Sequence, residues 1–166
     1  MDIFEFLQTQ GIVAERHSHP PVMTVEESLR LVPKLPGLKT KNLFLRDKKG
    51  ALFLVTALED AAIELKSLHR RFGATGRFSF GSADLMMETL GVTPGAVTPF
   101  GAINDTAQRV TVVLDAALMA HAMINAHPLT NTMTTSIARD DLVKFLQSTG
   151  HPPRIVGVVG PFQEPD

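Results

Sequence analysis

The chain has 166 residues, of which 44% are hydrophobic and 20% are charged, a composition typical of one ordinary globular domain. It contains no cysteine, which excludes disulfides, thiol catalysis and zinc sites built from thiolates. The sequence has no run of 18 apolar residues, and its first residues lack the basic and apolar regions of a signal peptide, so we expect a cytoplasmic protein without a membrane span.

The net charge of −1 is unevenly distributed along the chain. Residues 30–77 carry eleven Lys and Arg against four Asp and Glu, and the remainder of the chain is correspondingly acidic. Such a basic segment could meet a phosphate backbone. A solvated surface explains the same charges more simply, so charge alone does not identify a partner.

The N-terminal part of the chain predicts two helices and a strand. Apolar spacing predicts a short amphipathic helix over residues 2–10, ended by a glycine. Residues 13–19 predict a strand that is closed by a pair of prolines. Thr24, with Glu27 three residues later, forms a capping-box pattern that predicts a helix to about residue 32.

The clearest local signal is a β-hairpin. Apolar runs at 42–46 and 51–55 flank a four-residue turn at 47–50 that ends in glycine. Asp60 is then placed to cap a helix that runs to Phe72. The elements expected after it are a strand at 78–80, a helix capped by Ser82 and ending at Leu90, a Pro/Gly-rich loop at 93–101, strands at 110–114, 123–126 and 132–136, a helix at 140–147 and a last strand at 155–159.

Strands and helices alternate too irregularly for a doubly wound fold. We therefore expect an α/β or α+β domain over residues 1–166, with a mixed, mostly antiparallel sheet surrounded by helices. The sequence shows no repeats, long linker or low-complexity segment that would divide it.

Three segments carry unusual polar residues. Lys41 begins an otherwise apolar strand, where its ammonium could hold a carboxylate, a phosphate or a developing oxyanion, or could extend to solvent. Gly101 would let a ligand approach backbone N–H groups, or could simply form a turn. His127 and Asn131 could hydrogen-bond a substrate, although a plain turn accounts for them equally.

His17 and His19 lie two residues apart on a predicted strand and would face the same side, as a pair of metal ligands could. No obvious third ligand accompanies them, and the same pattern is explained if one histidine packs beside Pro20 and the other is solvated. The sequence also lacks the nucleophile elbow, the phosphate-binding loop and the zinc-protease motif.

Three motifs occur in order: KTKNLFLRD at 39–47, PGAVTPFG at 94–101 and HPLTNT at 127–132. Together they resemble the YbaK / prolyl-tRNA-synthetase-associated domain family, and most closely its ProXp-ala branch of stand-alone alanyl-tRNA(Pro) deacylases. The resemblance covers nearly the whole chain. It implies a mixed sheet with surrounding helices and neither metal nor cofactor.

The resemblance also implies a set of site residues. Lys41 would be the functional lysine, in preference to Lys39, and would position the substrate rather than act as a nucleophile. The residues implied to line the substrate site are Asn42, Gly101, His127, Asn131, Met23 and Thr24. Leu29 and Leu43 are further candidates for the pocket wall, although core packing explains them as well.

The implied reaction is hydrolysis of an aminoacyl ester, with the terminal ribose hydroxyl of the tRNA assisting the attacking water. A proline site rejects the smaller alanine weakly, by about 1–3 kcal/mol, so a second and smaller pocket is needed to remove misattached alanine. The implied partners are the acceptor end of mischarged proline tRNA and prolyl-tRNA synthetase, with no DNA and no membrane. Alternatives are a non-catalytic tRNA- or synthetase-binding module of the same fold, and a metal hydrolase that uses His17 and His19.

Overall fold

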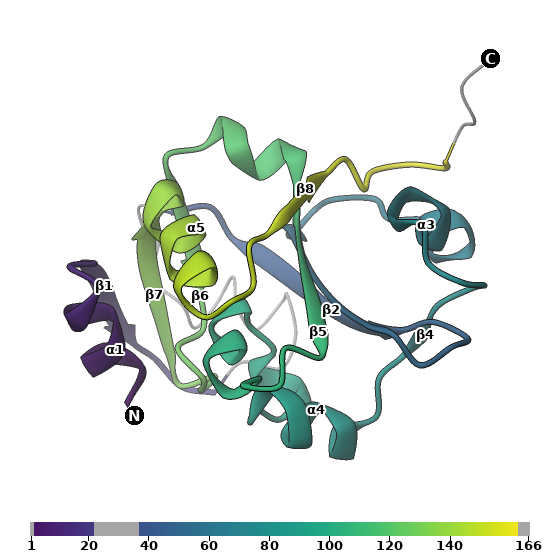
Figure 1. The fold of residues 1–166 in the computed structure, drawn as a ribbon. Coiled ribbons are helices and arrows are strands. Elements are labelled where there is room, and N and C mark those ends of the chain that lie inside the picture. The colour runs from purple at the N-terminus through teal and green to yellow at the C-terminus, as the bar shows by residue number, and fades with distance from the viewer. Residues whose placement is uncertain (1, 22–36, 163–166) are drawn as a thin grey trace.

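Two β-sheets, rather than the one sheet expected, organise the chain (Figure 1). The computed structural model describes residues 2–21 and 37–162. The larger sheet has the strand order β4-β2-β3-β5-β8, and the smaller has the order β1-β7-β6. The strands are β1 (Ala14–Ser18), β2 (Thr40–Arg46), β3 (Leu52–Leu58), β4 (Ser79–Phe80), β5 (Val110–Asp115), β6 (Met123–Ala126), β7 (Met133–Ala138) and β8 (Arg154–Val156).

The predicted hairpin is confirmed as β2 and β3, which pair antiparallel from Thr40↔Leu58 to Arg46↔Leu52. Its turn forms because the buried Asp47 carboxylate accepts hydrogen bonds from the N–H groups of Lys49 and Ala51. The larger sheet is mixed, as expected, since β4 pairs antiparallel with β2 while β5 lies parallel to both β3 and β8.

The start of β2 joins the two sheets. Leu38 forms a parallel bridge with Ile124 of β6. The Thr40 hydroxyl donates to the carbonyl of Asn125, at 2.7 Å. The smaller sheet is antiparallel throughout, so its strand β6 runs beside the first residues of the hairpin.

Most of the predicted helices are confirmed. The Asp2 and Ser82 side chains cap their helices, and Gly91, in the left-handed conformation, ends the second of these. The helix predicted after Thr24 lies outside the described residues. The helices are α1 (Ile3–Thr9), α3 (Leu65–Phe72), α4 (Ala83–Leu90) and α5 (Arg139–Ser148), with 3₁₀ helices η1 (Pro94–Ala96), η2 (Pro99–Asn104) and η3 (Ala116–Ala120).

Two predicted boundaries are wrong. Asp60 does not cap a helix: α3 begins at Leu65, because Glu64 is extended and Ile63 forms a bridge with Gly160. The last strand covers Arg154–Val156 rather than 155–159. Beyond it, Arg71 donates to the carbonyls of the C-terminal segment at Gly157, Val159, Gly160 and Pro161.

Helices α3 and α4 cover opposite faces of the larger sheet (Figure 1). Strand alternation explains the arrangement, since Leu45 packs on the α3 side and Phe44 on the α4 side. A third cluster lies between α1, α5 and the smaller sheet. Within residues 2–21 and 37–162, no helix is long and apolar enough to cross a membrane.

Candidate functional site

Lys41 and Asn42 lie side by side on β2 but face opposite sides of the sheet. Lys41 stands opposite Ala57, which belongs to the cluster under α3. Its Nζ donates to the carbonyl of Ala61 at 2.5 Å, and the side chain is half-buried. The ammonium is therefore tethered to the turn that follows β3.

A hollow of about 440 Å³ opens beside this turn. Asp60, which lines it, directly precedes the carbonyl that holds Lys41. Both apolar and charged residues line it, so it can accept a small molecule that is part apolar and part charged. The lining residues are Leu38, Lys39, Leu58, Glu59, Asp60 and His121.

Asn42 ties β2 to the Pro/Gly-rich loop on the α4 side. Its Nδ2 donates to the carbonyl of Val97 at 3.1 Å. Its Oδ1 accepts from the hydroxyl of Thr56, which is fully buried, at 2.6 Å. Both ends of the amide are used, so Asn42 is held in one orientation.

Gly101 is buried in η2, where the helix passes close to α4. A Cβ at this position would lie 2.9 Å from the Cβ of Leu90. The sequence predicts that Gly101 lets a ligand approach backbone N–H groups that could bind an oxyanion. The N–H of Gly101 itself donates to the carbonyl of Thr98. Close packing explains the glycine, and a contribution of Gly101 to substrate binding stays a prediction.

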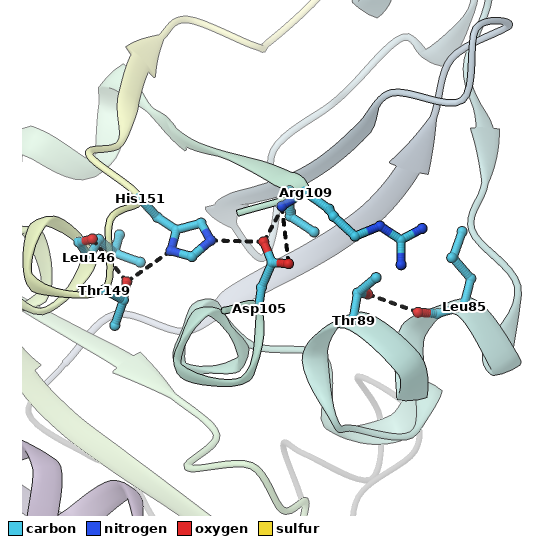
Figure 2. A network of polar contacts seen from close by, with 8 residues as sticks. Leu85, Thr89, Asp105, Arg109, Leu146, Thr149 and His151 are labelled. Carbon is cyan, nitrogen blue, oxygen red and sulfur yellow. Dashed lines mark hydrogen bonds and ion pairs between the residues drawn. The ribbon is translucent and has the colours of Figure 1, made fainter. Parts of the chain in front are cut away.

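A buried salt bridge fixes the end of η2 (Figure 2). Nε2 of His151 lies 2.8 Å from Oδ2 of Asp105, and both side chains are almost fully buried. The same carboxylate accepts from the N–H groups of Arg109 and Val110. On the far side, Nδ1 of His151 lies 3.0 Å from the Thr149 hydroxyl. This network, which we did not predict, holds the loop after η2 against β5 and the end of α5.

His127, at the end of β6, presents a nitrogen lone pair. Its Nδ1 donates to the carbonyl of Met133 at 2.9 Å, because a carbonyl can only accept, so the neutral ring keeps its lone pair on Nε2. Burial lowers the pKa of His127 below that of ordinary histidine. The hydrogen bond to Met133 opposes this effect, and positive charge on His19 adds to it. The lone pair is therefore available near neutral pH.

His19 lies beside His127, with ring centroids 6.2 Å apart. Its Nδ1 bonds the carbonyl of Pro20 and its Nε2 bonds the Thr134 hydroxyl, at 2.8 and 2.7 Å. Both ring nitrogens are thus already used. His17 instead approaches Glu15, at 3.5 Å. Among residues 2–21 and 37–162, no group of three His, Asp or Glu side chains is placed to hold a metal ion.

The turn between β6 and β7 carries Asn131, which is half-buried. Leu129 in this turn has a φ of 69°, which is unusual for a residue other than glycine, and it packs against both the α4 cluster and the cluster at α1 and α5. Met23, Thr24 and Leu29 lie outside the described residues.

The described residues of the predicted site lie on three segments of the chain. Asn42 lies against the loop that leads to Gly101. His127 and Asn131 belong to the end of β6 and the turn after it. Lys41 lies on the other face of β2 from Asn42. His19 lies beside His127, a neighbour that we did not predict.

Residues 19–145 match the model of the aminoacyl-tRNA editing domain. The chain belongs to this family. It is 41% identical over 157 residues to the prolyl-tRNA synthetase associated domain-containing protein 1 of Danio rerio, covering 93% of this chain and 85% of that protein. It is 39% identical over 134 residues to the prolyl-tRNA editing protein ProX of Acetoanaerobium sticklandii, covering 80% of this chain and 81% of that protein.

The fold of this editing domain is also found in solved structures. A crystal structure of the hypothetical protein APE2540 superposes with a TM-score of 0.71 at 17% identity, covering 94% of this chain and 99% of that one. Similarity at this level of identity concerns the fold, and it confirms the expected single α+β architecture. The family match extends from His19 to Phe145 and so includes Lys41, Gly101 and His127.

Proposed function

We propose that this editing domain is a deacylase that acts in trans on mischarged proline tRNA and removes alanine. The similarity to a prolyl-tRNA editing protein over about four fifths of both chains carries the proposal. The three motifs that resemble the alanyl-tRNA(Pro) deacylases support alanine as the amino acid.

The reaction is hydrolysis of an ester. Water oxygen attacks the carbonyl carbon, the bond to the ribose oxygen breaks, and that oxygen takes up a proton, which leaves free alanine and uncharged tRNA. An ester is activated enough that the site has only to orient the water and stabilise the developing negative oxygen. A serine or cysteine nucleophile is not required.

Lys41 is proposed to position the substrate by its charge. Its ammonium is held at the turn after β3, next to the hollow at Asp60. A fixed cation there attracts the carbonyl oxygen as it becomes negative, or the terminal phosphate. His127, with its lone pair on Nε2, is proposed to accept a hydrogen bond from the ribose hydroxyl that assists the water.

Selection of alanine follows from size. A pocket that fits a methyl side chain excludes the proline ring sterically, whereas a proline site discriminates against alanine by only about 1–3 kcal/mol. The editing domain therefore supplies the discrimination that the synthetase site lacks, and correctly charged prolyl-tRNA is spared.

The test is release of labelled alanine from alanyl-tRNA(Pro) by the purified protein, with and without a chelator. Lys41→Ala is expected to reduce release by about 100-fold or more, the usual size of loss for one charge-stabilising group. Lys144→Ala, which removes an exposed lysine on α5 that does not line the hollow, is the control and should stay within a few-fold of the parent.

Equal activity of the parent, Lys41→Ala and Lys144→Ala would refute the role of Lys41. Salt-sensitive tRNA binding without any release would instead identify a non-catalytic binding module. Release that disappears with the chelator would favour a metal hydrolase.

A further inference from the structure

Four basic side chains converge where the hairpin turn meets the end of α3. Burial lowers the pKa of His69, and the positive charges of Arg70, Arg77 and Lys48 lower it further, so all three cations act on the same imidazole. Three of these side chains are exposed and form the cationic patch: Lys48, Arg70 and Arg77.

The backbone holds the patch together. The N–H of Lys48 donates to the carbonyl of Thr75 at 2.9 Å, and the N–H of Thr75 donates to the carboxylate of Asp47 at 3.1 Å. The stem of Lys48 lies directly over Gly76, where a Cβ would be 2.4 Å from its Cδ. The turn and the loop at 73–77 are thus joined as one unit, which fixes the spacing of the cations.

The one acid within residues 46–50 and 69–77 does not neutralise this surface. Asp47 is buried, which would raise its pKa, but hydrogen bonds from the backbone of Thr75, Ala51, Lys49 and Gly50 outweigh burial and lower it. Its negative charge therefore stabilises the hairpin turn. The exposed charges of the unit are all positive.

An exposed aromatic ring, that of Phe80, lies on the α3 side of the larger sheet. Phe80 of β4 pairs with Leu45 of β2, and directly paired residues face the same side. Leu45 packs under α3, so Phe80 faces that side too, and it remains 62% exposed. Phe78, two residues before it, packs into the α3 cluster and contacts the ring of His69, with centroids 6.4 Å apart.

Cations beside an exposed aromatic ring match the chemistry of a single nucleic-acid strand. Lys and Arg hold phosphates, and a flat ring stacks on a base of any sequence. A small free anion would use the charges and leave the ring unexplained. The distance also fits: Leu45 is four residues from Lys41 along β2, about 14 Å at a rise of 3.4 Å per residue.

We infer that the cationic patch and Phe80 bind the single-stranded RNA nucleotides that precede the esterified adenosine. This inference rests on the proposed function, which places the ester at Lys41. The strand β2 then sets the distance between the two contacts. Its first residues lie at the esterified adenosine of the tRNA, and its last residues lie beside the phosphates and a base a few nucleotides away.

The experiment measures binding of the whole protein to uncharged tRNA(Pro) by fluorescence anisotropy over a range of salt concentrations. The triple variant Lys48→Ala/Arg70→Ala/Arg77→Ala should bind more weakly. Its plot of log binding constant against log salt concentration should be less steep by about 2, since each single-strand phosphate contact contributes about 0.7 to the slope. Lys144→Ala, an exposed lysine on α5, is the charge control and should keep the parent's affinity within about twofold.

Substitutions of Phe80 separate stacking from apolar packing. Phe80→Ala should weaken binding by about 5- to 150-fold, the range measured for loss of one stacked base. Phe80→Trp should retain binding, whereas Phe80→Leu should behave like Phe80→Ala. All variants change exposed side chains, and matching thermal melts establish that they are folded.

The inference is overturned if the triple variant and Phe80→Ala bind tRNA as Lys144→Ala does, or if they lose affinity for the synthetase but not for RNA. Because uncharged tRNA is the probe, failure of hydrolysis and failure of this surface give different results. In an active enzyme, the triple variant should raise KM for alanyl-tRNA with kcat retained, and should leave hydrolysis of alanyl-adenosine unchanged.

Discussion

Replacement of Asp105 by alanine tests the network that supports the loop around Gly101. The Asp105 carboxylate bonds His151 at 2.8 Å and accepts the N–H groups of Arg109 and Val110 at 3.1 and 2.9 Å. The side chains of Asp105 and His151 are only 2% and 1% exposed, so water cannot replace the lost partner without opening the structure. Figure 2 shows that the carboxylate lies between the His151 ring and the backbone at Arg109.

The expected cost follows from leaving one member of a buried pair alone. Breaking such a pair destabilises a protein by about 3–5 kcal/mol. For a chain of this size, each kcal/mol moves the melting temperature by about 2–4 °C, so Asp105→Ala should lower it by about 6–20 °C. Circular dichroism during heating, with urea unfolding as the second probe, measures the change.

The exposed pair of Glu88 and Arg109 provides the comparison. These side chains are 66% and 46% exposed and lie 3.1 Å apart, so Glu88→Ala should cost less than about 1 kcal/mol. A double-mutant cycle of Asp105→Ala with His151→Ala should show that the two losses do not add. Additive losses, or an Asp105→Ala cost no larger than that of Glu88→Ala, would refute the reasoning from burial.

Three further predictions concern the site. His127 is proposed to act with a neutral ring, and burial lowers its pKa, so activity should be retained just below pH 6.5 and fall only at lower pH. In His127→Gln this fall of activity at low pH should be weaker. The same fall in the variant as in the parent would assign it to another group. The same lowered pKa means that the unfolded chain binds the proton more readily, so the parent should lose stability relative to His127→Gln as pH falls below about 6.5. Gly101→Ala should lower the free energy of unfolding in urea by about 1–3 kcal/mol, because the added Cβ meets Leu90. Gly157→Ala, where a Cβ would have open space around it, should leave that free energy almost unchanged. Equal losses in the two variants would contradict the packing explanation.

Local features of the fold are readable from the sequence. The hairpin turn is signalled by its glycine, since Gly50 has a φ of +86°. Ser82 and the glycine after α4 likewise predict the two ends of that helix. The hydroxyl of Ser82 accepts a hydrogen bond from the N–H of Leu85, as a helix cap does. These signals depend on neighbours in the chain.

Long-range contacts account for what the sequence did not reveal. The two sheets meet through Thr40 and Asn125, which are 85 positions apart. Asp60 looked like a helix cap because pairing of the following residues with the C-terminal segment cannot be seen locally.

The site shows the same limit. Strand alternation alone indicates that Lys41 and Asn42 face opposite sides. The neighbour of His127, His19, comes from a distant strand end, and no periodicity or spacing in the sequence links the two.

The most direct test of the central claim is deacylation by the purified protein across alanyl-, seryl-, cysteinyl- and prolyl-tRNA(Pro). We expect rapid release of alanine and no release of proline above the spontaneous rate. Stable alanyl-tRNA, or proline released as fast as alanine, would contradict the account.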